Sequence, residues 1–177
     1  MLDSGPVKQA SSQKLCYAIS MNIRQAEIQD ALLLSVLCAD VQHLHASHHP
    51  EVFKMPSTPD FAETFFRDQL QDPLVHIFIA EQDGLAIGYI FCKLTERPEN
   101  AFRHENRFVH IDQISVAPDK QGHGAGAALM AGACALAKEL GVKRVQLDTW
   151  DFNLKAHGFF EYEGFTKFMY HYWLTLE

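Results

Sequence analysis

The stretch from Val109 to Leu140 constrains the fold of this chain more than any other part of it. Residues 109–116 are rich in β-branched side chains, which is typical of a strand. Three glycines then fall close together, at Gly122, Gly124 and Gly126. After them, apolar side chains recur at helical spacing, at Leu129, Met130, Ala133, Leu136, Ala137 and Leu140. The sequence therefore predicts a strand, a glycine-rich turn and the start of a helix.

A unit of this kind can bind an anion. The first main-chain N–H groups of a helix have no intrahelical acceptor, and the helix dipole favours negative charge there. Glycine also lets a ligand approach the main chain closely. We therefore expect residues 121–126 to hold a phosphate or diphosphate, with a glycine-rich connector that binds nothing as the alternative. A Walker-type loop is excluded, because Gly126 is followed by two alanines instead of Lys-Ser/Thr.

A dinucleotide-binding turn is a closer match, since Gly122, Gly124 and Ala127 fit its spacing and Asp148 ends the next apolar stretch. That turn, however, requires the strand to run almost directly into the first glycine, and residues 117–121 intervene here. Too little chain also follows the next predicted strand to build a doubly wound sheet. A dinucleotide-dependent oxidoreductase is therefore only a third hypothesis for the function of this chain.

Two motifs resemble those of the GNAT superfamily of N-acetyltransferases. Gln121, Gly124 and Gly126 match the acetyl-CoA loop of that superfamily, Gln/Arg-x-x-Gly-x-Gly/Ala, after its usual lead-in Ile-Ser-Val-Ala-Pro. The second motif, Asn-x-x-Ala-x-x-Phe-Tyr-x-x-x-Gly-Phe, is matched in register at Asn153, Ala156, Phe159, Gly164 and Phe165. The resemblance covers about residues 17–176 and is densest after residue 109.

The resemblance implies acetyl-CoA as cosubstrate and a set of residues that hold it. These residues lie at the end of the strand, in the turn and at the second motif: Ile114, Ser115, Val116, Gln121, Gly122, His123, Gly124, Ala125, Gly126 and Asn153. In the family, a main-chain N–H near 114–116 binds the thioester carbonyl, and the asparagine at Asn153 bonds the pantetheine arm. Asparagine is also a good helix N-cap, and Asn153 can serve in both ways.

Asp112 is the candidate catalytic residue, because an attacking amine must lose a proton and many family members carry a carboxylate there. Alternation along the strand predicts that His110, Asp112, Ile114 and Val116 share one face. A structural hydrogen bond or a surface position is the alternative for Asp112, and His110 is a second candidate base. The family's tyrosine acid aligns with Phe160, and Tyr162 falls on the other side of the predicted helix, so no acid is assigned.

Composition narrows the partners and the location. The net charge of −7 argues against nucleic acid and is compatible with a cationic amine. The longest apolar stretch, 31–39, is too short for a membrane span, and no signal peptide is visible, so we expect a cytoplasmic protein. The four cysteines lie in separate apolar runs: Cys16, Cys38, Cys92 and Cys134. We expect them to be reduced, which fits a cytoplasmic protein. Four histidines follow closely in the sequence: His43, His45, His48 and His49. Nothing fixes their geometry as a metal site would require, so no metal is expected. We expect them to lie near the site that binds the acceptor amine.

The expected fold is α/β of the GNAT type, with a mixed, mostly antiparallel sheet of six or seven strands flanked by about four helices. Strands are predicted at 17–23, 75–81, 85–94, 109–116, 142–150 and 165–176. Helices are predicted at 30–45, 60–70, 153–162 and in the stretch ending at Gly141, with a polar loop at 96–107. A mobile tail at 1–14 is expected to precede a single domain at 15–177.

The main functional hypothesis is an acetyl-CoA-dependent N-acetyltransferase that acts on a primary amine of a small molecule by direct attack. The alternative is a non-catalytic acyl-CoA-binding or sensor protein of the same fold, suggested by Phe160 in place of tyrosine. A homodimer is compatible with the resemblance, with the aromatic last strand as its interface.

Overall fold

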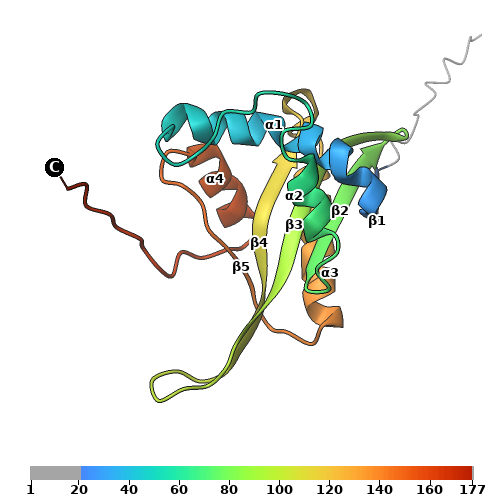
Figure 1. Ribbon diagram of the computed structural model, residues 1–177. Coiled ribbons are helices and arrows are strands. Elements are labelled where there is room, and N and C mark those ends of the chain that lie inside the picture. The colour runs from blue at the N-terminus through green and yellow to red at the C-terminus, as the bar shows by residue number, and fades with distance from the viewer. Residues whose placement is uncertain (1–20, 177) are drawn as a thin grey trace, which may run out of the picture.

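The computed structural model describes residues 21–176 and has a five-stranded sheet at its centre (Figure 1). The strands lie in chain order: β1 (Met21–Gln25), β2 (Val75–Gln82), β3 (Leu85–Arg97), β4 (Asn106–Val116) and β5 (Val145–Leu147). β1 to β4 pair antiparallel, and β5 joins β4 in parallel. The mixed, mostly antiparallel sheet is as predicted, with five strands in place of six or seven. The predicted tail 1–14 and the start of the predicted first strand lie outside the described residues.

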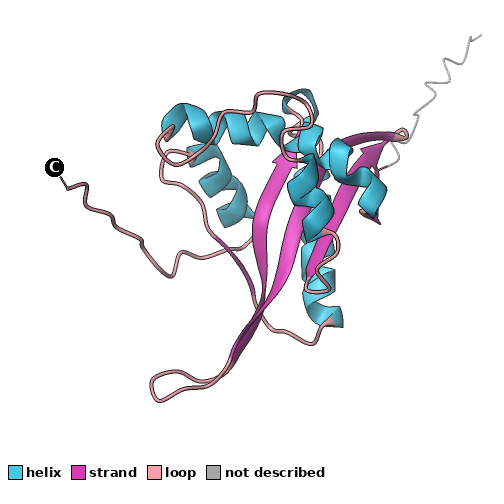
Figure 2. Ribbon diagram, viewed as in Figure 1, coloured by secondary structure: helices cyan, strands magenta, loops and turns pink. Residues whose placement is uncertain are grey.

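Helices cover both faces of the sheet (Figure 2). On one face, α1 (Ala31–His48) and α2 (Glu63–Gln69) enclose a core that includes Leu34, Phe66, Ile77, Tyr89 and Phe91. On the other, α3 (Ala125–Glu139) and α4 (Leu154–Tyr162) enclose a second core with Ile90, Cys92, Ile111, Leu129 and Phe160. Neighbouring residues of β3 thus serve opposite cores, because side chains alternate along a strand. Among residues 21–176, no helix combines the length and apolar character needed to cross a bilayer.

A β-bulge interrupts β4 at Asp112. Ile111 lies opposite Cys92 on β3, and Gln113 lies opposite Phe91, so Asp112 between them has no partner on β3. An extra residue in one strand shifts the alternation of every side chain beyond it. Odd-numbered residues of β4 therefore face the core of α3 before the bulge and the core of α1 and α2 after it, and even-numbered residues do the reverse.

The bulge makes the predicted shared face of His110, Asp112, Ile114 and Val116 wrong. His110 lies opposite Lys93 and belongs to the face of α1 and α2, whereas Ile114 and Val116 pack with the core of α3. The sequence carries a signal for this shift, because the polar residues Asp112 and Gln113 follow each other and move the apolar positions from 109 and 111 to 114 and 116.

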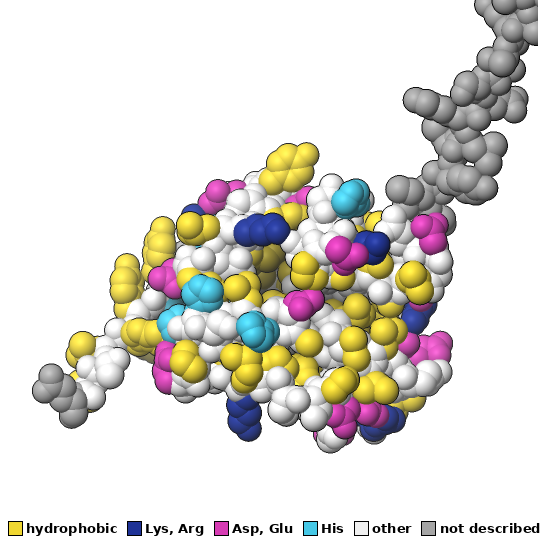
Figure 3. Space-filling model, turned by 90° about the horizontal axis from the view of Figure 1, so that it is seen from above, with side chains coloured by type: hydrophobic (Ala, Val, Ile, Leu, Met, Phe, Trp, Pro, Cys, Tyr) yellow, Lys and Arg dark blue, Asp and Glu magenta, His cyan; other side chains and the backbone are white. Residues whose placement is uncertain are grey.

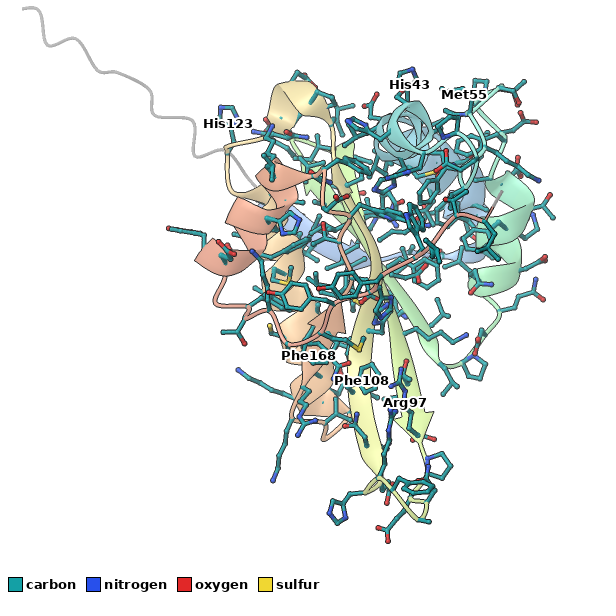
Figure 4. All side chains as sticks on the ribbon, turned by 90° about the vertical axis from the view of Figure 1, so that its left-hand side faces the viewer. His43, Met55, Arg97, Phe108, His123 and Phe168 are labelled. Carbon is teal, nitrogen blue, oxygen red and sulfur yellow. The ribbon has the colours of Figure 1, made fainter. Side chains whose placement is uncertain are left out.

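β3 and β4 extend beyond the body as a two-stranded ribbon (Figure 1). Pairing continues to Arg97 and Asn106, so the connecting loop spans only 98–105 and the predicted loop at 96–107 is shorter than expected. The Arg97 guanidinium stacks over the ring of Phe108 at 5.3 Å from its centre, and both are labelled in Figure 4.

Two predicted strands are corrected near the C-terminus. β5 covers Val145–Leu147 instead of 142–150, because the chain leaves the edge of β4 after Leu147. The predicted strand at 165–176 is not a strand: this segment runs extended away from α4 (Figure 1). Its alternating pattern is typical of a strand, but a strand also requires a neighbour for its main-chain groups. We call residues 166–176 the C-terminal arm.

Candidate active site

An open strand edge forms where β4 and β5 separate. The two strands pair only from Val109 to Ile111 and from Val145 to Leu147. The amide of Ala117 donates to the Ile87 carbonyl at 2.8 Å, which fixes the alternation of main-chain groups beyond the bulge. The groups of Gln113 and Ser115 point to β3, and those of Ile114 and Val116 point to the open edge. The open edge can thus hydrogen-bond an extended ligand that carries amides.

Gln121 connects this edge to the turn and to α4. Its side-chain nitrogen donates to the Val116 carbonyl at 2.8 Å, and its side-chain oxygen accepts from Lys155. The predicted Gln121 therefore acts through its side chain as a tie between three segments of the site.

The glycine-rich turn presents main-chain donors to solvent. Gly122 and Gly124 have φ angles of 80° and 90°, which side-chain-bearing residues rarely adopt. The first hydrogen bond of α3 runs from the Ala128 amide to the Gly124 carbonyl at 2.9 Å. Within the described part of the chain, the amides of 122–127 donate no hydrogen bond. These amides and the N-terminus of α3 form a site for a phosphate or diphosphate.

Ala125 and Gly126 have packing roles in this unit. Ala125 is buried under the turn, and a Cβ atom on Gly126 would lie 3.1 Å from the ring of Phe159. The glycine at position 126 thus lets α4 pack against the first turn of α3, while its amide stays among the free donors.

Two lysines lie next to the turn although the chain as a whole is acidic, and one of them, Lys120, pairs with Asp119 at 3.4 Å. Lys155 is exposed beside Gln121, Lys120 precedes the turn, and His123 projects from it, away from the body (Figure 4). Seen from above, the molecule is hollowed near its middle, at the end of the sheet where β4 stops (Figure 3). The sequence interpretation missed Lys155, whose signal was a lysine in the first turn of the helix that follows Asn153.

Asn153 is the N-cap of α4, as expected: its side-chain oxygen accepts from the Ala156 amide at 3.2 Å. Its side-chain nitrogen donates no hydrogen bond to any residue of 21–176, so it is available to a ligand carbonyl. Ser115, by contrast, is not brought to the open edge. It is buried and donates to the Leu37 carbonyl at 3.0 Å, which ties β4 to α1.

Asp112 is exposed and is the first residue of β4 beyond its last pair with β5. Its carboxylate makes no ion pair or hydrogen bond within residues 21–176. Burial raises the pKa of the neighbouring Tyr89 well above its ordinary value, with smaller contributions from Cys38 and Asp112. The Tyr89 hydroxyl donates to the side-chain oxygen of Gln113 at 2.6 Å. Asp112 thus lies at the apex of the open edge with its oxygens available.

Neither Phe160 nor Tyr162 offers a hydroxyl group at the open edge to protonate the leaving thiolate. Phe160 is buried in the core of α3 and α4, 6.0 Å from the ring of Phe165. Tyr162 is 87% exposed on the surface of α4. His110, the second candidate base, lies on the face of α1, where its ring nitrogen is 3.8 Å from Asp148.

Three of the four predicted histidines join aromatic rings at the end of α1. We call this group the aromatic–histidine cluster: His45, His48, His49, Phe53, Trp150 and Phe152. The rings of His48 and Phe152 stack at 4.0 Å, and burial lowers the pKa of His45, with smaller effects from His48 and His49. His43 points outward (Figure 4). Residues 21–176 contain no group of three or more side chains arranged to hold a metal ion.

Phe152 directly precedes Asn153, so the aromatic–histidine cluster borders the open edge on the side of α1. The contribution of Trp150 and Phe152 was missed at the sequence level, because Trp150 was assigned to the end of a strand and Phe152 to the connection that follows it. A separate hollow of about 320 Å³ lies at the far end of β4, in the β3–β4 ribbon, between Arg97 and Arg103. It is distant from the turn and shares no residue with it.

Comparison with known proteins agrees with this geometry. Residues 38–165 match the model of the acetyltransferase (GNAT) family. The uncharacterized N-acetyltransferase YhfO of Bacillus subtilis (strain 168) is 30% identical over 147 residues, which are 83% of this chain and 91% of YhfO. The chain therefore belongs to the GNAT family and to the enzyme class of N-acetyltransferases.

Solved structures share the fold. A tetramutant of the BH1408 protein from Bacillus halodurans superposes with a TM-score of 0.81 at 22% identity, over 88% of this chain and 99% of that one. The aminoglycoside N-acetyltransferase AAC(6')-Iy in complex with CoA has a TM-score of 0.67 at 19% identity, over 92% and 98%. The doubly wound parallel sheet of a dinucleotide-binding protein is not what residues 21–176 form, since β1 to β4 are antiparallel.

Proposed function

We propose that this protein transfers the acetyl group of acetyl-CoA to a primary amine of a small molecule by direct attack. One observation carries the proposal: the open edge of β4 leads directly into a turn whose amides, 122–127, are free. CoA has the matching chemistry, with amides along its pantetheine arm and a diphosphate beyond them. Gln121 holds the edge and the turn at a fixed distance from each other.

The diphosphate fits the turn by charge as well as by hydrogen bonding. The free amides and the dipole of α3 favour an anion, and Lys155 adds positive charge at the rim. We assign the side-chain nitrogen of Asn153 and the carbonyl of Ile114 to the amides of the pantetheine arm, since the first has no acceptor within residues 21–176 and the second points to the open edge. We assign the cofactor set accordingly, with Ser115, Ala125 and Gly126 supporting the backbone.

In the reaction, the amine nitrogen attacks the thioester carbon, the C–S bond breaks, and the CoA thiolate leaves. The amine must give up a proton, and we assign its acceptor as Asp112, directly or through a water molecule. Position supports this role, because the carboxylate is exposed at the apex of the open edge. We assign the stabilisation of the charge that develops on the carbonyl oxygen to the main-chain N–H groups of Ile114 and Val116, which point to the same edge.

The thiolate has no protonating tyrosine at position 160, where the phenylalanine is buried. Protonation by water is sufficient, because a thiolate is a fair leaving group. The acceptor amine is expected to contact the aromatic–histidine cluster, which borders the edge opposite the turn. Reduced cysteines, with Cys38 and Cys92 buried, fit a cytoplasmic enzyme.

The test is a mass-spectrometric screen for acetyl transfer from acetyl-CoA to polyamines, amino acids and aminoglycosides. Asp112→Asn is expected to lower kcat by roughly 100-fold while CoA affinity stays within about twofold, because only the proton acceptor is lost. Asp119→Asn, on an exposed carboxylate just before the turn, is the matched control and is expected to retain activity. Transfer to no amine in the screen would count against the proposal.

A non-catalytic acyl-CoA-binding protein is the second candidate, and the buried Phe160 favours it. In that case CoA binds in calorimetry, no thioester is consumed above the spontaneous rate, and Asp112→Asn changes neither result. The two candidates are therefore separated by the same set of measurements.

A further inference from the structure

A hydrogen bond in the core of α1 and α2 ends directly beside Asp112. The hydroxyl of Tyr89, on β3, donates to the side-chain oxygen of Gln113 at 2.6 Å. Gln113 is the first residue of β4 that pairs with β3 after the bulge, and it lies opposite Phe91. Because Tyr89 is two residues from Phe91 on β3, the two side chains are diagonal neighbours on one face of the sheet. The bond therefore ties β3 to the residue that follows Asp112.

Packing alone does not require the Tyr89 hydroxyl. The side chain is fully buried, and its ring packs edge to face against Phe66 at 5.7 Å. A phenylalanine would fill this space without a polar group, and a buried hydroxyl is costly unless it is hydrogen-bonded. Burial raises the pKa of Tyr89, with smaller contributions from Cys38 and Asp112, so the hydroxyl keeps its proton and remains a donor at neutral pH.

Asp112 depends on its neighbours in the strand for its position. It has no partner on β3, and its carboxylate makes no hydrogen bond or ion pair within residues 21–176. On one side, Ile111 is held by pairing with both β3 and β5. On the other side, the side chain of Gln113 is held by Tyr89. Since an aspartate side chain is short, its main chain decides where the carboxylate oxygens lie.

We propose that Tyr89 and Gln113 are positioning residues, whose hydrogen bond holds the bulge of β4 in the shape that brings the Asp112 carboxylate to the attacking amine. The inference rests on the proposed function, in which Asp112 accepts the proton of that amine. The two residues act only through Asp112. Proton transfer requires its partners within hydrogen-bond reach, so a displaced carboxylate slows the reaction while the binding of CoA is unaffected.

The kinetic test uses Tyr89→Phe, Gln113→Met and the double variant, with an amine that the wild type acetylates. Tyr89→Phe removes the donor, and Gln113→Met removes the acceptor while the length of the side chain is kept. Each is expected to lower kcat by roughly 10-fold, while KM for the amine and the affinity for CoA stay within about twofold.

Thermal stability separates positioning from packing. Gln113→Met leaves the buried hydroxyl of Tyr89 without its acceptor, so it is expected to lower Tm the most. The double variant leaves neither group unpaired, so Tm should recover while kcat stays low. Ile77→Val, in the same core, is the matched control and should lower Tm without changing kcat. A double variant in which kcat recovers together with Tm would show a role in packing only and overturn the inference.

Action through Asp112 is tested in the Asp112→Asn variant. In this background, Tyr89→Phe is expected to change kcat by less than about twofold, because no carboxylate is left to position. A second loss as large as that in the wild type would contradict the proposed role.

Amide hydrogen exchange, followed by NMR, tests the same hydrogen bond without turnover. The main chain of Gln113 pairs with β3, and its amide is expected to exchange roughly 10-fold faster in Tyr89→Phe, while the amides of β1 keep their rates. An unchanged rate at Gln113 would overturn the inference. If the screen finds no acceptor amine, the proposed function fails, and exchange still decides whether Tyr89 holds the bulge. The two failures are therefore distinguishable.

Discussion

The ring of Phe159 lies 3.1 Å from the position that a Cβ atom on Gly126 would occupy. This contact joins the first turn of α3, which presents the free amides, to α4, which presents Asn153 and Lys155. The two parts of the site that would hold CoA are thus positioned by one glycine and one aromatic ring.

Gly126→Val is expected to destabilise the fold by about 1–3 kcal/mol, because the branched side chain must displace the ring of Phe159. CoA affinity should fall with it, since α4 moves relative to the turn. Chemical denaturation and calorimetry measure the two effects. Gly158→Val is the control for the change in helix propensity, because a Cβ there meets nothing within 4 Å. Adding Phe159→Leu to Gly126→Val should restore part of the loss, and no restoration would contradict the contact.

Lys155→Ala is expected to weaken CoA binding by roughly 10-fold, since it removes a charge from the rim of the turn and frees Gln121. Lys155→Arg should retain most of the affinity. Isothermal calorimetry at two salt concentrations checks the result, because an ionic contribution falls as salt rises. Lys138→Ala, in the last turn of α3, removes the same charge far from the turn and should leave binding unchanged. Equal losses for Lys138→Ala and Lys155→Ala would show that only net charge matters.

Stability should depend on pH through His45. Burial is the main cause that lowers the pKa of this residue in the folded protein, below its unfolded value near 6.5. Between the two values the unfolded chain binds more protons, so the free energy of unfolding rises with pH across that interval. We expect Tm to fall as pH is lowered through about 6.5, and His45→Phe to flatten this dependence. Calorimetry over that range tests it, and His43→Phe, at an exposed position of the same helix, should keep the wild-type profile.

An ion-pair network fixes β1 and the start of α1, and its pH dependence has the same sign as that of His45 but lies in a more acidic range. Arg24 binds Asp30 through two hydrogen bonds, at 2.7 and 2.9 Å, and these lower the pKa of Asp30. A depressed carboxyl pKa contributes stability that is present above the unfolded value, near 3.9, and is lost as pH falls through the folded value. Asp30→Asn should cost about 1–2 kcal/mol at neutral pH. That cost should vanish in acid, and Asp119→Asn should show no such pattern.

The sequence predicted the elements that have strong periodic or glycine signals. The turn at Gly122 and Gly124, the helix after it and the cap at Asn153 were placed correctly. These features depend on local chemistry: positive φ, helical spacing and a capping side chain.

Other features depend on neighbours that a pattern does not reveal. The missing last strand depends on the lack of an adjacent edge, whereas the bulge had a sequence signal in the successive polar residues Asp112 and Gln113. Ser115 was placed in the cofactor set because of its position in a motif, but its hydroxyl bonds the Leu37 carbonyl across the sheet. Pairing partners far apart in sequence decide such cases.

The extra residue in β4 has a consequence for how this enzyme can diversify. Because Asp112 has no partner on β3, its side chain can be exchanged for another acid, an amide or a neutral residue while both cores keep their packing. Deletion of Asp112 would leave Ile111 opposite Cys92 and Gln113 opposite Phe91, as in a regular strand, so Ile114 and Val116 would still face α3 while the exposed carboxylate would be lost. Chemistry at this position can therefore change, or be removed altogether, without repacking either core.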